Sequence, residues 1–260
     1  MKRLITYLNE WKYNGNVDIE APIEILYYPS TYKELKEIIK EKYADNYKIL
    51  DLRDVDVSQV TAFGMSGKEQ EGLFQYLHNV EEINIRGWNT SNVKKMTCMF
   101  DGCKSLKTIK GIESIDTSNV RDFSNMFYNC VSLESINVSK WNTVKVGTTS
   151  EMFSGCEKLI HIDGIENWNV KKLRYAYRMF SGCRKMKKIN LTNFKNAPLE
   201  TMIYMFSDCQ SLVEIRGIES WDLSSVKHMN YMFLDVFNDS IIPSWYDKEK
   251  WDNNNWYYQN

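Results

Sequence analysis

The sequence predicts an α/β repeat protein, a solenoid of about seven coils with a parallel sheet, short helices and a small α+β N-terminal cap. The main observation is a Met-Phe-x-x-Cys motif that occurs five times, with its phenylalanine at Phe100, Phe127, Phe153, Phe180 and Phe206. The steps between these phenylalanines are 27, 26, 27 and 26 residues, and 27 more lead to Phe233. A period in this range is typical of solenoids, in which each repeat contacts its neighbours.

Each repeat combines a segment with helical spacing and a segment typical of a strand. In the first clear coil Met96, Met99, Phe100 and Cys103 stand at i, i+3, i+4 and i+7, which places their side chains on one face of a helix. An isoleucine nine residues after each repeat phenylalanine ends a Leu-x-x-Ile run that is typical of a short strand. We therefore expect one short helix and one strand per coil, with the strands stacked into a parallel sheet.

Polar corners and glycines divide the repeats further. Trp88-Asn-Thr-Ser-Asn-Val93 indicates a corner, because Asn, Ser and Thr side chains satisfy local backbone amides. A Gly-Ile-Glu sequence at Gly111, Gly164 and Gly217 returns every 53 residues and predicts a bulge or a positive φ. The deeper unit is therefore a pair of coils. A degenerate coil precedes the clear ones, with about seven residues inserted around positions 64–71.

These motifs resemble those of the BspA-like leucine-rich repeat family. The resemblance rests on Trp88 to Val93 followed by Met96-x-x-Met99-Phe100-x-x-Cys103-x-x-Leu106-x-x-Ile109, and on their counterparts across residues 49–242. It implies a right-handed, leucine-rich-repeat-like solenoid built for binding, as in the secreted or surface-anchored adhesins of bacteria and protists. The run Tyr28-Pro29-Ser30-Thr31-Tyr32 is also similar to a segment that precedes the repeats in short members carried by bacteriophages and prophages.

Three regions follow: an N-terminal cap at 1–48, the BspA-like solenoid at 49–242 and an aromatic cap or tail at 243–260. Thr31-x-x-Glu34 is a capping box, and it predicts a helix over residues 31–43 after a short strand at 23–27. Beyond Pro243 the chain is rich in Trp and Tyr. These rings either form a lid over the last coil, which we favour, or an exposed tail for glycan or protein contact.

Five of the six cysteines occupy one repeat column, and Cys98 is the exception. Coils lie about 5 Å apart in a stack, so these thiols should form a ladder inside the solenoid. Disulfides are compatible with that spacing, but we favour a reduced core, because free cysteine packs as a small hydrophobe. The close Cys pairs typical of zinc sites are missing. We expect neither a metal nor a cofactor.

Location is inferred from the missing targeting signals. The first ten residues begin with basic side chains but contain no sustained apolar run, and no stretch of the sequence approaches the length of a membrane span. This pattern favours a cytoplasmic protein, in the host cell if the gene belongs to a phage. A virion or cell-surface location is the alternative.

Charge is balanced overall at −1, but residues 167–199 hold nine basic side chains and no acidic one. This run is either a solvated strip, a surface for an acidic protein or, less favoured, a nucleic-acid site. Tyr204 and Tyr231 fall in the column of Arg178, and Arg and Tyr are enriched in binding hot spots. The predicted partner-binding residues are Lys171, Lys172, Arg174, Tyr175, Tyr177, Arg178, Arg184, Lys185, Lys187, Lys188, Tyr204 and Tyr231.

Catalysis receives little support from the sequence. The three histidines lie in separate coils without a recurring nucleophile or carboxylate at fixed spacing, and phosphate-loop and zinc-protease motifs are absent. We therefore predict a non-enzymatic scaffold that binds a protein, such as a phage protein that blocks a host defence complex by occupying it. The alternatives are an adhesin for host protein or glycan, and nucleic-acid binding through the basic coil.

Overall fold

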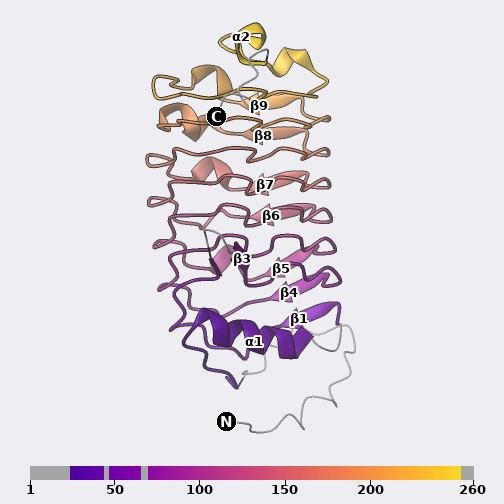
Figure 1. Ribbon diagram of the computed structural model, residues 1–260, viewed down its shortest axis with the longest axis vertical. Coiled ribbons are helices and arrows are strands. Elements are labelled where there is room, and N and C mark those ends of the chain that lie inside the picture. Colours follow the sequence, from indigo (N-terminus) through magenta and orange to yellow (C-terminus); the bar gives the residue numbers. More distant parts are fainter. Residues whose placement is uncertain (1–23, 44–46, 66–69, 253–260) are drawn as a thin grey trace.

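The computed structural model describes residues 24–43, 47–65 and 70–252. Figure 1 shows an elongated stack of coils with short strands along one side and a helix at each end. The strands and helices are α1 (Tyr32–Tyr43), β1 (Ile49–Asp51), β2 (Gly64–Met65), β3 (Glu71–Gly72), β4 (Glu82–Asn84), β5 (Thr108–Lys110), β6 (Ser135–Asn137), β7 (His161–Asp163), β8 (Lys188–Asn190), β9 (Glu214–Arg216) and α2 (Lys248–Asp252). The chain is a parallel β-solenoid with few helices.

The predicted single sheet is divided into short parallel sheets that follow the coil pairs. β1, β4 and β5 form one sheet, β6 pairs with β7, and β8 pairs with β9. In each coil pair the central isoleucines are in register, as Ile136 is with Ile162. The 53-residue unit inferred from the glycine pattern therefore also governs the strand pairing.

Glycines fix the difference between the two coils of a pair. We call the coils with Gly111, Gly164 and Gly217 the Gly coils, and the preceding coils, whose strands end in asparagine, the Asn coils. Gly164 has φ of 86°, which confirms the positive φ predicted from the sequence, and a 3₁₀ turn (η2, Ile165–Asn167) follows it. A Cβ atom at Gly164 would lie 2.2 Å from Cα of Ser139 in the Asn coil beneath. A side chain is therefore excluded by both conformation and space.

A second, continuous ladder runs up the opposite part of each coil. Parallel bridges join one residue per coil, in the order Ala62, Lys95, Asp122, Thr148, Tyr175, Thr201 and His228. Beside it lies the Met-Phe segment, the eight residues that end at the repeat cysteine (96–103 in the first clear coil). The backbone of this segment is hydrogen-bonded to the coils above and below it.

The prediction of a short helix in each Met-Phe segment is wrong. Cys98, Phe100 and Gly102 donate their amide protons to carbonyls of the next coil at 2.7 to 3.0 Å, while the intervening Met99 and Asp101 donate within their own coil. An α-helix would instead direct every amide to the carbonyl four residues earlier. A chain of turns that bonds alternate amides to a neighbouring coil therefore replaces the helix.

This chain of turns requires a positive φ at two positions per segment. One position lies two residues before the repeat phenylalanine, where Arg178 has φ of 49° and Tyr204 has φ of 57°. The other lies two residues after it and holds residues that adopt this conformation readily, such as Asn129 and Gly155. The first position is left-handed in each clear coil whatever the residue, so this conformation belongs to the ladder and is independent of the side chain.

The core is filled by stacked columns of identical residues. Rings from Phe74 to Phe233 stack with centroid separations of 5.1 to 6.0 Å. The five ladder cysteines are fully buried, as predicted, and each thiol donates to the carbonyl of a phenylalanine one coil below, as Cys156 does to Phe127 at 3.0 Å. Burial raises the pKa of Cys156 to about 12. The thiols are therefore protonated and enclosed at neutral pH.

Helix α1 covers the first coil at the N-terminal end of the stack (Figure 1). The predicted helix is confirmed: Thr31 Oγ1 accepts from Glu34 N at 3.2 Å, and the Glu34 carboxylate accepts from Ser30 N at 2.7 Å. Leu35 and Ile39 are the buried residues on its inner face. In place of the expected strand at 23–27, the described residues 24–27 form a single parallel bridge, from Tyr27 to Val55.

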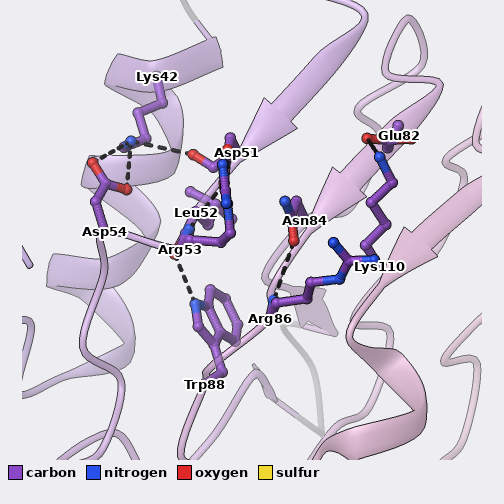
Figure 2. A network of polar contacts seen from close by, with 10 residues as sticks. All are labelled: Lys42, Asp51, Leu52, Arg53, Asp54, Glu82, Asn84, Arg86, Trp88 and Lys110. Carbon is purple, nitrogen blue, oxygen red and sulfur yellow. Dashed lines mark hydrogen bonds and ion pairs between the residues drawn. The ribbon is translucent and has the colours of Figure 1, made fainter. Parts of the chain in front are cut away.

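Polar contacts join α1 to the first coil. In Figure 2, Lys42 from α1 reaches the Asp54 carboxylate, and both carboxylate oxygens accept from Lys42 Nζ at 2.8 Å. Nearby, Trp88 Nε1 donates to Leu52 O at 2.9 Å and links the corner of one coil to the coil below. Of the insertion predicted near residues 64–71, positions 66–69 lie outside the described residues, and the flanking β2 and β3 form a small antiparallel pair.

Aromatic residues cover the C-terminal end of the described chain. Tyr246 is 6% exposed and meets Phe233 edge-on at 5.0 Å, while Trp245 stacks on Trp221 at 6.4 Å. The Trp245 indole donates to Ile218 O at 3.1 Å. This packing favours the lid alternative for these two residues. Trp256, Tyr257 and Tyr258 lie outside the described residues.

Candidate functional site: a basic groove beside an arginine and tyrosine column

The bend that enters each Met-Phe segment places one outward position per coil in a continuous line. This bend line contains Lys94, Arg121, Gly147, Arg174, Glu200 and Lys227, each six residues before a repeat phenylalanine. Each of these residues after Lys94 donates its backbone N–H to the carbonyl of the one before it, at 2.8 to 3.3 Å. Adjacent members therefore lie about 5 Å apart.

A concavity of about 450 Å³ opens on the bend line at Gly147. We call it the basic groove. Its lining residues are Arg121, Lys145, Gly147, Lys171, Lys172, Arg174, Tyr175 and Pro198. Tyr175 is 44% exposed. The groove thus brings together five basic side chains, one exposed ring and no carboxylate from consecutive coils.

The charges of the groove are only partly compensated. Arg174 Nη1 lies 2.7 Å from Glu200 Oε1, and Lys227 binds the other oxygen of the same carboxylate. These two cations hold the pKa of Glu200 below its ordinary value. Lys145 Nζ lies 2.6 Å from the neutral Asn119 Oδ1. Excess positive charge therefore remains on the open side of the groove.

A column of aromatic and cationic side chains lies four positions further along each coil. We call Arg178, Tyr204 and Tyr231 the Arg-Tyr column. The Arg178 guanidinium lies 4.7 Å from the ring centre of Tyr204 and 5.2 Å from that of Tyr177, and Tyr204 stacks on Tyr231 at 5.1 Å. Cation–π contact and stacking both favour this arrangement, and the left-handed backbone fixes the direction of each side chain.

Glu151 continues the Arg-Tyr column one coil below Arg178. Burial raises the pKa of its carboxyl, and the positive charge of Arg178 counters part of that effect. The Arg178 Nε–H is itself buried and has no hydrogen-bond acceptor among the described residues. Because an unpaired buried donor costs free energy, the surrounding tyrosines and backbone must hold Arg178 in place.

The remaining predicted residues lie elsewhere on the coil. Arg184, Lys185, Lys187 and Lys188 follow the buried Cys183 and lead into β8. Arg184 lies 2.7 Å from Asp208 and 3.2 Å from Glu157, and Lys188 lies 2.8 Å from Glu214. Several predicted cations are therefore paired with carboxylates of the adjacent coils. The structure brings Lys171, Lys172, Arg174 and Tyr175 together in the groove, and Tyr177, Arg178, Tyr204 and Tyr231 together at the column.

Two basic residues of the groove were missed by the sequence analysis. Arg121 lies on the bend line two coils before Arg174, and Lys145 stands one repeat before Lys172. The search for a continuous basic run ended at residue 167 and excluded both. A search along the repeat columns would have found them, because residues one period apart are spatial neighbours in a solenoid.

Few side chains on the described surface are arranged as catalytic or metal-binding groups. His161 Nε2 lies 3.8 Å from Asp163 Oδ2 on β7, with both side chains more than half exposed. Within the described ranges no group of three His, Cys, Asp or Glu residues could hold a metal ion. No described helix is both long and apolar enough to cross a membrane.

The sequence matches a known sequence family. The sequence family described as "Mycoplasma protein of unknown function, DUF285" matches residues 68–189 and 158–259, well over half of the chain. The chain belongs to this family. The DUF285 match covers most of the region predicted to hold BspA-like repeats and includes the basic groove and the Arg-Tyr column. No curated protein matches the chain.

Solved structures that resemble this DUF285 chain include two leucine-rich repeat proteins. The T. pallidum protein TpLRR is 17% identical with a TM-score of 0.39, and the match covers 65% of this chain and 69% of TpLRR. A protein from Bacteroides ovatus ATCC 8483 is 19% identical with a TM-score of 0.33, and the match covers 71% of this chain and 51% of that protein. These values give no basis for transferring a partner.

Proposed function

We propose that this DUF285 chain is a non-enzymatic scaffold that binds a protein with an acidic surface through the Arg-Tyr column and the basic groove. We further propose that the chain consists of an N-terminal cap at 1–48, a solenoid of about seven coils at 49–242 and a C-terminal aromatic cap at 243–260. Packing of Leu35, Ile39 and Tyr246 against the ends supports the two caps, since an open solenoid would expose its core.

The observation that carries the proposal is the stack of Arg178, Tyr204 and Tyr231 on the outside of a hydrogen-bonded ladder. Arg and Tyr supply most of the binding energy in many interfaces because they combine apolar area with directed polar contacts. Here the stack fixes the side chains and the ladder fixes their backbones. Little conformational entropy should therefore be lost when a partner binds.

The groove supports an acidic partner. Its five basic side chains converge without a lining carboxylate, although the whole chain carries a net charge of only −1. Complementary charge speeds association and selects partners more than it adds affinity. We propose that the Arg-Tyr column supplies the affinity and the groove the selectivity.

A finer proposal concerns the biological setting. We propose a phage or prophage protein in the cytoplasm of the host cell, where it occupies the surface of a host complex, such as a defence complex, and blocks it without chemistry. The support is the resemblance of Tyr28 to Tyr32 to the segment that precedes the repeats in short phage-borne members.

The test is capture of proteins from a lysate of the natural host by the tagged chain at moderate salt. The variant Arg178→Ala/Tyr231→Ala removes two of the three side chains of the column, and Arg86→Ala/Tyr28→Ala removes the same residue types at exposed sites elsewhere. We expect a protein to be retained by the wild type and by the control pair, and lost by the column variant. Equal capture by both variants, each with wild-type circular dichroism, would remove the column as the binding surface.

A further inference from the structure

The basic groove exists because one side chain is missing from the bend line. Arg121, Gly147 and Arg174 are consecutive members of this line, and the two arginines therefore stand about 10 Å apart with an empty position between them. A Cβ atom at Gly147 would meet nothing closer than 3.8 Å, and its φ lies outside the left-handed region. Glycine at position 147 is thus required neither by backbone conformation nor by packing. Its lack of a side chain leaves the open space between Arg121 and Arg174.

The cations around this space have few competing partners. Arg121, Lys171 and Lys172 form no ion pair with another described residue, and Lys145 binds a neutral amide. By contrast, Arg184 and Lys188, outside the groove, are already paired with carboxylates. An incoming anion would therefore meet available charge at Arg121 and the three lysines without first displacing an internal carboxylate, while Arg174 shares its charge with Glu200.

We propose that the groove at Gly147 is a specific recognition pocket that receives an acidic side chain from a short, extended, Asp- or Glu-rich segment of the protein partner. The inference rests on the proposed protein-binding function and adds the chemical class of the bound segment and the place where it sits. Arg121 and Arg174 would flank the carboxylate, and the lysines of the adjacent positions would contact the next acidic residues. From the coil of Arg121 to that of Pro198 there are three coil steps, about 15 Å, which is the length of four or five extended residues.

The groove is less suited to a nucleic acid. Single-stranded nucleic acids are bound on successive aromatic side chains, whereas Tyr175 is the sole ring in this lining. At one end of the groove Glu200 is the next member of the bend line, so the positive track stops there. A short segment with a few carboxylates fits this limited track better than a continuous phosphate backbone does.

The experiment measures fluorescence anisotropy of a fluorescein-labelled octapeptide of alternating Glu and Ser, with the full chain and three variants. Gly147→Gln fills the space without changing the charge. Lys171→Glu/Lys172→Glu reverses two groove cations, and Lys140→Glu/Lys158→Glu makes the same charge change at two exposed lysines that line no part of the groove and form no described ion pair. Far-ultraviolet circular dichroism and the thermal midpoint establish that each variant is folded.

We expect the wild type and the Lys140/Lys158 variant to bind the peptide with the same affinity. The Gly147 variant and the Lys171/Lys172 variant should each bind about tenfold more weakly or worse. Equal peptide binding by all four folded proteins would overturn the proposal of an acidic-segment pocket. The proposal would also be overturned if a dT12 oligonucleotide bound more tightly than the peptide and Gly147→Gln blocked that binding. If the peptide result fails while lysate capture still depends on Arg178, the pocket is wrong and the proposed function stands. If neither the peptide nor any lysate protein is bound, both fail.

Discussion

Three glycines allow the cost of a left-handed backbone to be separated from the cost of a steric clash. Gly164 has φ of 86°, and a Cβ atom there would lie 2.2 Å from Cα of Ser139. Gly87 has nearly the same φ, 85°, but a Cβ atom would meet nothing within 4 Å. Gly147 has neither restriction. Alanine at Gly164 therefore tests the backbone strain and the clash together. Alanine at Gly87 tests the backbone strain alone, and alanine at Gly147 tests neither.

The expected magnitudes follow from these distances. Alanine in the left-handed region costs about 1–2 kcal/mol, while the loss of glycine's freedom in the unfolded chain returns about 0.4–1 kcal/mol. Gly87→Ala should thus destabilise by about 1 kcal/mol, and Gly147→Ala should be neutral or slightly stabilising. At Gly164 the backbone of Ser139 must also move until a 2.2 Å approach reaches ordinary contact. Overpacking of this kind adds about 1–3 kcal/mol, for a total of about 2–4 kcal/mol.

Urea unfolding followed by circular dichroism gives the free energy of unfolding of each variant. If the transition is not two-state, the midpoint of the first phase replaces the free energy, because repeat proteins can unfold in parts. Equal losses for Gly164→Ala and Gly87→Ala would refute the steric argument. A large loss for Gly147→Ala would refute the reasoning for both Gly147 and the groove.

Three further predictions concern the core, the column and the C-terminal end. Cys156, whose pKa is raised to about 12 by burial, should resist iodoacetamide at pH 8 in the native protein and react once urea unfolds it; rapid native labelling would contradict the enclosed ladder. Glu151→Gln should stabilise the fold at pH 7, because burial raises the pKa of this carboxyl and the fold therefore disfavours its ionised form. That gain should vanish below the ordinary pKa of 4.5, where the carboxyl is protonated in both states, and thermal midpoints at pH 7 and 4 decide the sign. Trp245→Ala should lower the thermal midpoint through loss of a partly buried ring stacked on Trp221, with a cost of about 1–3 kcal/mol, and an unchanged midpoint would show that this ring does not stabilise the end.

Much of the core could be predicted from the sequence because the repeat columns report burial directly. The phenylalanine and cysteine columns are buried, as is the isoleucine column up to Ile215, and the positive φ at Gly164 was expected from its neighbours. The Met-Phe segment could not be assigned in this way. Met96, Met99, Phe100 and Cys103 face inward in a chain of turns just as they would in a helix, so their spacing cannot separate the two structures.

The deciding contacts for that segment come from the neighbouring coil. Backbone amides of 96–103 bond to carbonyls about 26 residues later, and a pattern read within one repeat does not include them. Small or turn-forming residues such as Asn129 and Asp208, two residues after the phenylalanine, were the available sign of a left-handed backbone.

The basic surface was only partly predictable for the same reason. Residues 167–199 lack acidic side chains in sequence, yet Glu200 and Asp208 from the next coil neutralise Arg174 and Arg184. Charge in a solenoid is compensated along columns, one period away, and therefore escapes a linear count. Arg121 was missed because it joins the groove along the same direction.

The fit between Gly coils and Asn coils sets how such a protein can change its length. Gly217 packs against Thr192 as Gly164 packs against Ser139, so each Gly coil needs an Asn coil beneath it. Loss or duplication of a single coil would put the wrong partner under a glycine, whereas a 53-residue duplication would preserve every contact. Natural length variants and engineered extensions should therefore grow by whole coil pairs, each adding about 10 Å of new surface on which a different specificity can evolve.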